Sequence, residues 1–108
     1  MTARVDHPLI GTWRIVGADL WDRDYLDLVE PASIIFGQNG RGQFAFGAVH
    51  GDMDLEYSPS RILFTWAGFD EMDEVSGSGS AELDDTGNLE IELSIHLGDD
   101  AVLKARRK

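Results

Sequence analysis

The sequence predicts an all-β protein, an eight-stranded antiparallel barrel that runs up and down and carries one short helical lid segment. Three observations support this prediction: apolar and polar residues alternate over most of the chain, turn sequences separate the alternating segments, and one segment has helical spacing. The length of 108 residues suits a single domain over 1–108, and a hydrophobic fraction of 43% is sufficient for a core.

The alternation is clearest in two segments. In residues 52–57, Met53, Leu55 and Tyr57 face one way and the acidic residues between them face the other. Residues 88–97 alternate in the same way, with leucine or isoleucine at every odd position. A period of two is typical of half-buried antiparallel strands. Further strands are predicted at 9–18, 32–37, 41–49, 61–67 and 101–107.

Turn sequences and one helical segment connect these strands. The turns are predicted at 37–41, 58–60 and 84–88. The first of them contains Asn39-Gly40, the strongest short hairpin signal. In residues 19–31 the apolar side chains fall at helical spacing, Asp19 is placed to cap the start, and Pro31 ends the segment. A short helix or helical turn is therefore expected there.

Residues 75–83, with the sequence VSGSGSAEL, have the composition of a flexible linker but the alternation of a strand. Val75 and Leu83, at the two ends, fall in phase with Gly77 and Gly79. As a tether, the segment leaves seven strands. As a strand it gives eight, the number that closes a small barrel and removes its edges, and we favour this interpretation.

The tripeptide Gly11-Thr12-Trp13, on the first predicted strand of this meander, resembles the start of proteins of the lipocalin and wider calycin superfamily. The resemblance implies a small bacterial lipocalin-like barrel with Trp13 at its closed base and a basic residue of the last strand packed across the indole. Arg106 or Arg107 is the matching candidate, and Arg106 is assigned to the closed end together with Gly11 and Trp13. The chain is shorter than a typical lipocalin, and no helix is predicted after the last strand.

The order of the strands places the longer connections at one end of the barrel, which is the arrangement expected of a ligand-binding barrel. These connections are predicted at 19–31, 50–52, 68–74 and 96–100. The glycines of 75–83 face the interior and leave space for a small apolar or aromatic ligand. The predicted ligand-binding residues are Phe44, Phe46, Tyr57, Phe64, Trp66, Gly77, Gly79 and Trp21. The alternative is a packed core in which the aromatic side chains fill this space.

The net charge of −11 excludes nucleic acids and anionic membranes as expected partners, because binding to phosphate requires clustered Lys and Arg. Many acidic residues fall in the longer connections, so we expect either a cationic or neutral apolar ligand or a basic partner protein. Solubility is the simpler explanation of the same charge. Those acidic residues are Asp19, Asp22, Asp24, Asp27, Asp52, Asp70, Glu71, Asp73, Glu74, Asp99 and Asp100.

Other kinds of site have weak signals. The chain has no cysteine, which fits a reducing compartment, and no apolar run of membrane-spanning length, so a soluble cytoplasmic protein is expected. His50 and His96 lie near Gly-Asp sequences but lack a ligand spacing, so neither a metal nor another cofactor is predicted. No catalytic residue is assigned, since no nucleophile motif stands out.

Three functions are consistent with these features. The first is a binding module that holds a small molecule inside the barrel. The second is a calycin-like barrel enzyme of the cyclase or isomerase type, in which Tyr57 is the polar group inside the barrel. The third is a filled barrel that acts through its surface on a partner protein, which the absence of an interior cavity would favour. The sequence leaves open whether the protein forms a homodimer.

Overall fold

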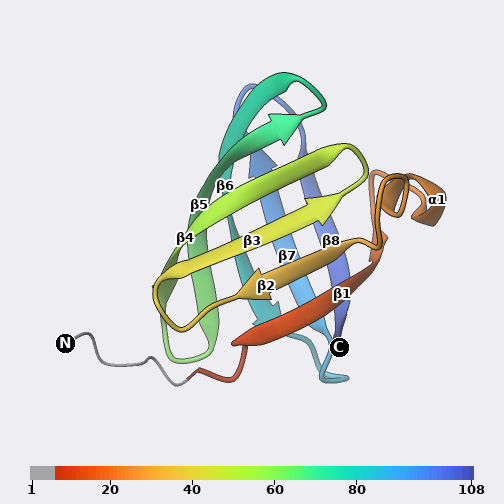
Figure 1. Cartoon of the computed structure of the whole chain (residues 1–108). Coiled ribbons are helices and arrows are strands. Elements are labelled where there is room, and N and C mark those ends of the chain that lie inside the picture. The colour runs from red at the N-terminus through yellow and green to blue at the C-terminus, as the bar shows by residue number, and fades with distance from the viewer. Residues whose placement is uncertain (1–6) are drawn as a thin grey trace.

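The computed structural model describes residues 7–108, which form eight strands and one short helix (Figure 1). The elements are β1 (Gly11–Ala18), α1 (Arg23–Leu26), β2 (Ser33–Phe36), β3 (Arg41–Phe46), β4 (Val49–Tyr57), β5 (Arg61–Asp70), β6 (Asp73–Leu83), β7 (Leu89–Ile95) and β8 (Asp100–Arg107). Each strand pairs with the next, and β1 pairs with β8, so the sheet closes into a barrel. The predicted eight-stranded up-and-down barrel is thus confirmed.

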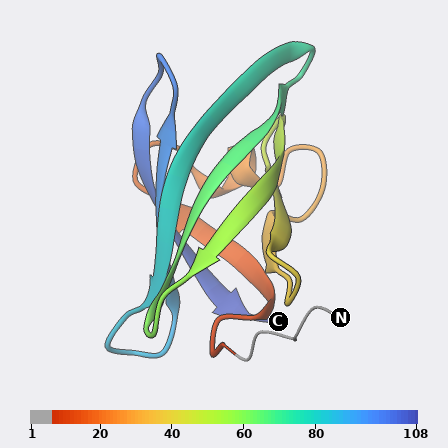
Figure 2. The same cartoon turned by 90° about the vertical axis from the view of Figure 1, so that its left-hand side faces the viewer.

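The barrel has two different ends. The closed end carries the turns β2–β3, β4–β5 and β6–β7, together with the start of β1 and the end of β8. The open end carries α1 and the turns β3–β4, β5–β6 and β7–β8. The β5–β6 and β7–β8 hairpins project furthest from the closed end (Figure 2).

Residues 75–83 belong to β6, which pairs with β5 from Asp73 to Glu82 and with β7 from Gly77 to Leu83. The strand interpretation is confirmed and the tether is wrong. A Cβ atom at Gly77 would lie 1.9 Å from the carbonyl oxygen of Ser94 on β7, and one at Gly79 would lie 2.5 Å from that of Glu92. Glycine is therefore required because the neighbouring backbone occupies the position of a side chain.

The barrel interior is the hydrophobic core. Of the side chains predicted to point inward, most are buried, while Leu55, Tyr57 and Ile95 are half-buried and pack against the rest. Among residues 7–108, no polar or charged residue is fully buried. The fully buried residues with the largest side chains include Trp13, Phe36, Phe46, Ile15, Ile34, Met53, Ile62, Leu89, Ile91 and Leu93.

The basic residue that covers Trp13 at the closed end is Arg107, and the assignment to Arg106 is wrong. The guanidinium carbon of Arg107 lies 4.1 Å from the centre of the Trp13 ring. Its nitrogens donate to the carbonyl oxygens of Ile10, at 2.7 Å, and Pro8. Strand parity explains the difference: Arg107 follows the inward series of β8, whereas Arg106 has the outward parity. Gly11, with φ +127°, lies beneath this guanidinium, and its Cβ would be 2.8 Å from Nη1.

The connections at the open end are shorter than predicted. The β3–β4 turn is made by residues 47 and 48, so residues 50–52 belong to β4 and His50 lies on a strand. Most of 68–74 is also strand, with a turn at residues 71 and 72. Antiparallel pairing continues to the ends of β5 and β6 and converts the expected loop into a tight hairpin.

Helix α1 begins later than predicted, and a different aspartate caps it. Asp22 Oδ1 accepts a hydrogen bond from the Tyr25 amide, while Asp19 instead accepts one from the Val102 amide on β8. Only four residues are helical, because the chain must return to begin β2 at Ser33. The rest of the predicted segment consists mostly of bends, with one turn residue.

Replacing Gly77 with alanine should destabilise the barrel by about 3 kcal/mol, because the added methyl group overlaps the β7 backbone. Gly17→Ala is the matched control, since nothing lies within 4 Å of a Cβ atom at Gly17. That variant should stay within about 0.5 kcal/mol of the parent. Urea unfolding followed by tryptophan fluorescence measures both. Equal stability of the two variants would contradict the close strand approach.

Replacing Arg107 with alanine should lower the free energy of unfolding by about 1–2 kcal/mol, because it removes the contact with the Trp13 ring and two hydrogen bonds. Arg106→Ala makes the same change in net charge on the neighbouring residue and should have an effect below about 0.5 kcal/mol. Thermal unfolding of the two variants at the same salt concentration compares them. A larger loss for Arg106→Ala would reverse the assignment.

Candidate functional site

The space left by the interior glycines is filled. A Cβ atom at Gly77 would lie 2.9 Å from Trp66 Nε1, and one at Gly79 would lie 2.5 Å from Phe64 Cζ. Both rings are buried, and the Trp66 indole nitrogen donates to the Ser94 carbonyl oxygen at 3.3 Å. A ligand in the predicted interior pocket would have to displace these two rings.

Most of the other predicted ligand-binding residues meet in one aromatic cluster at the open end. The Phe44 ring packs edge-on against Trp66, with 5.0 Å between centres, and is stacked with Phe46 at 5.7 Å. Trp21, from the lid segment, packs against Phe46 at 5.1 Å and against Tyr25. The structure therefore brings these residues together, but as a packed core.

The lid segment is fastened to this core. The Gly47 amide, in the β3–β4 turn, donates to the Leu26 carbonyl oxygen at 2.7 Å, and Leu26 is buried. Asp27 accepts hydrogen bonds from the Arg14 guanidinium at 2.8 Å and from the Ala32 amide at 3.0 Å. Both bonds hold the pKa of the Asp27 carboxyl below its ordinary value, and the bond from the Ala32 amide has the larger effect.

Tyr57 lies apart from the aromatic cluster. Its hydroxyl donates to the Gly37 carbonyl oxygen and accepts from the Gly40 amide at 3.0 Å, so it fastens the β2–β3 turn at the closed end. His7 packs beside it and hydrogen-bonds through Nε2 to the Ser58 carbonyl oxygen. The hydroxyl that the enzyme hypothesis places inside the barrel is therefore bonded to a turn.

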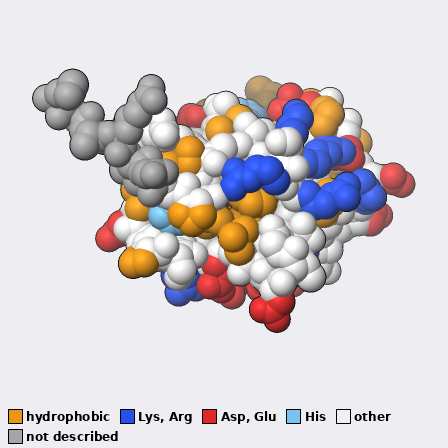
Figure 3. Space-filling view, turned by 90° about the horizontal axis from the view of Figure 1, so that it is seen from below, with side chains coloured by type: hydrophobic (Ala, Val, Ile, Leu, Met, Phe, Trp, Pro, Cys, Tyr) orange, Lys and Arg blue, Asp and Glu red, His pale blue; other side chains and the backbone are white. Residues whose placement is uncertain are grey.

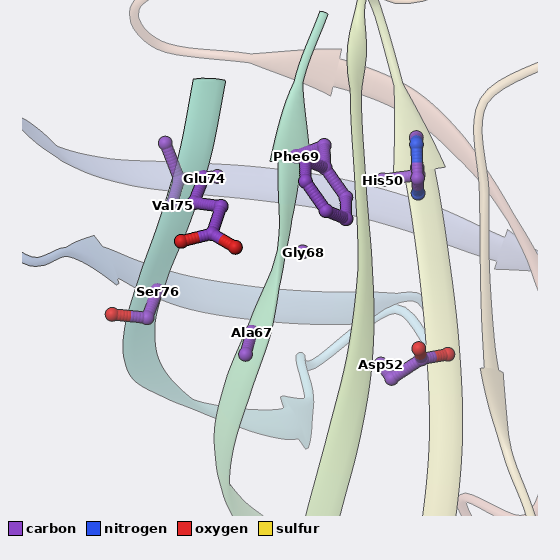
Figure 4. A pocket seen from close by; sticks show the side chains of 8 residues that line it. All are labelled: His50, Asp52, Ala67, Gly68, Phe69, Glu74, Val75 and Ser76. Carbon is purple, nitrogen blue, oxygen red and sulfur yellow. The ribbon is translucent and has the colours of Figure 1, made fainter. Parts of the chain in front are cut away.

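An open hollow of about 520 Å³ lies on the outer face of β4, β5 and β6. Figure 4 shows Phe69 between Glu74 and His50, and Ala67 between Ser76 and Asp52. The strand register places His50, Phe69 and Glu74 in one cross-strand row. The lining residues are His50, Asp52, Ala67, Gly68, Phe69, Glu74, Val75 and Ser76.

Two further hollows continue along the same face. One, of about 560 Å³, extends toward β7; besides Thr65, Ser78 and Ser94 it is lined by Trp66 and Gly77, two of the predicted ligand-binding residues. The other, of about 270 Å³, lies toward the closed end beside Leu63 and Glu56. Outward side chains of β5 line all three hollows. We call these side chains, Leu63, Thr65, Ala67 and Phe69, the outer strip.

The electrostatic surroundings of the first hollow are acidic. Asp52 and Glu74 line it with exposed carboxylates, and among residues 7–108 no Lys or Arg does so. Arg41 of β3 forms an ion pair with Asp54 at 3.3 Å, and Arg61 of β5 forms one with Glu82 at 3.9 Å. Other Lys and Arg side chains gather at the closed end, where apolar side chains lie between them (Figure 3).

Sequence reasoning did not find this hollow, because it placed His50 in a connection and Asp52 where that connection meets a strand. The available signal was the outward parity of β5, on which Leu63 and Phe69 are apolar and about 40% exposed. On a half-buried strand, those positions are usually polar. Over the described chain, no three His, Asp or Glu side chains are grouped as metal ligands.

Comparisons with known proteins do not assign this chain to a family. No protein-family model, no curated protein and no solved structure matches it. The barrel is consistent with a lipocalin-like fold by strand order alone. Residues 7–108 include no helix with the length and apolar character needed to cross a bilayer.

Replacing Asp27 with asparagine should destabilise the protein at pH 7 and have little effect near pH 2.5. A carboxyl whose pKa is lowered by folding stabilises the folded state above its unfolded pKa of about 3.9. That stabilisation is lost as the pH falls through the lower, folded pKa. Urea midpoints of parent and variant at the two pH values measure it, with Asp99→Asn as the control. A difference between parent and Asp27→Asn that does not shrink at low pH would contradict this role.

Proposed function

We propose that this protein is a binding module in which the filled barrel is the scaffold and the outer hollow at His50, Phe69 and Glu74 receives a cationic group of the ligand. The main observation behind this proposal is that the space at the interior glycines is occupied, whereas the hollow on the outer face is open. Phe64 and Trp66 occupy the space at the interior glycines, while about 520 Å³ beside β5 stays open to solvent. This volume lies within the range typical of small-molecule sites.

The chemistry of the hollow supports a cation next to an apolar surface. The Phe69 ring is 41% exposed, and a cation over an exposed aromatic ring is stabilised by roughly 0.5–1 kcal/mol. Asp52 and Glu74 add negative charge on two sides of the hollow. The interior site of a lipocalin-like carrier is less well supported, because an occupant would have to move two buried rings against close packing.

Benzyltrimethylammonium, a cation attached to one aromatic ring, is a suitable probe. In a titration followed by ¹H–¹⁵N NMR, the amides of His50, Phe69 and Glu74 should shift together. Glu74→Gln should weaken binding about threefold, the effect of one exposed carboxylate. Asp85→Asn removes the same charge in the β6–β7 turn at the closed end and should leave the affinity unchanged.

Two outcomes would overturn the proposal. If Phe44, Phe64 and Leu93 shift while Phe69 and Glu74 do not, the ligand site is inside the barrel. If no amide shifts at millimolar probe concentrations, the hollow does not take a cation.

A further inference from the structure

The outer strip is a largely apolar band that includes one polar residue, Thr65, and carboxylates border it on both sides. All four of its side chains are exposed. On one side, β4 presents Asp52 and Glu56, which pair in register with Ala67 and Leu63. On the other side, β6 presents Glu74 and a run of small serines, and beyond them β7 presents the exposed Glu92.

The size of this band matches one helix. Six residue steps separate Leu63 from Phe69, which corresponds to about 20 Å along a strand. About 13 residues of α-helix cover that length. Adjacent strands lie about 4.8 Å apart, so the carboxylates flank the strip at roughly 5 Å on β4 and 10 Å on β7. Cationic side chains on the two flanks of a helix about 10–12 Å wide reach these positions.

We infer that the outer strip docks a basic amphipathic helix of a partner protein, with the helix's apolar face on β5 and its Lys and Arg side chains on the carboxylates of β4, β6 and β7. This inference rests on the proposed function, because the cationic group in the hollow at Phe69 becomes one side chain of that helix. Complementary charge selects this occupant, since the face is apolar along its centre and acidic along both borders.

Two other occupants fit less well. An added β-strand needs a long free sheet edge, but every strand of the barrel pairs on both sides, and the part of β6 that extends past its pairing with β7, residues 73–76, is only four residues long. A second copy of the chain brings a net charge of −11 to an acidic face. The one helix within residues 7–108, α1, has only four residues and is too short to cover the strip.

A synthetic helix of about 16 residues tests the inference directly. It carries leucine at i, i+3, i+4 and i+7, Lys or Arg on both flanks, and a fluorophore for anisotropy measurements. We expect saturable binding that weakens at least tenfold between low salt and 0.5 M salt. Ala67→Lys, in the centre of the strip, should weaken binding at least tenfold, while Gln38→Lys in the β2–β3 turn makes the same charge change without effect.

Three results would overturn the inference. The first is equal binding of a peptide with the same composition but no apolar face. The second is unchanged affinity of a folded Ala67→Lys variant, verified by its thermal unfolding. The third is absence of helix binding. If benzyltrimethylammonium still shifts the amides around Phe69, only the helix inference fails, whereas loss of both signals removes the proposed function as well.

Discussion

Close approach of neighbouring backbones at glycine is the constraint on which the barrel depends. At Gly77 and Gly79 of β6, carbonyl oxygens of β7 lie where Cβ atoms would be, and at Gly68 of β5 the carbonyl oxygen of His50 does the same from β4. Bends at glycine allow a sheet to curve enough to close. They also remove side chains from the inner wall. The Trp66 and Phe64 rings lie in the space that results, so the curvature and the filled interior have one origin.

Much of the architecture could be predicted because alternation, turn chemistry and strand parity are local properties. Residues 75–83 were recognisable as a strand because Val75 and Leu83 keep the same phase. The ends of the strands could not be predicted, because pairing between β5 and β6 extends into residues with turn-like composition. The sequence also could not predict that aromatic rings occupy the space at the interior glycines. Parity shows that Gly79 and Phe64 both face inward, but it does not show that the Phe64 ring lies over Gly79.

Charge is distributed unevenly between the two ends of the barrel. Acidic residues occupy the connections of the open end and border the outer strip, whereas the C-terminal Arg106, Arg107 and Lys108 lie at the closed end. Part of this basic group has a structural task, since Arg107 covers Trp13. A positively charged molecule that approaches is therefore drawn toward the open end and the face of β4–β6. Favourable charge and exposed apolar surface coincide there.

Arg107 hydrogen-bonds to Ile10, which is 97 positions away in the sequence, and to Pro8, which is 99 positions away. Apart from β1–β8, every strand pairing in the barrel links strands that follow one another in the sequence, so the meander can assemble progressively from hairpins. Sealing β1 to β8 requires closure of nearly the whole chain and is the slowest kind of contact to form. A sheet in which β1 and β8 are unpaired exposes two free edges, and free edges favour self-association.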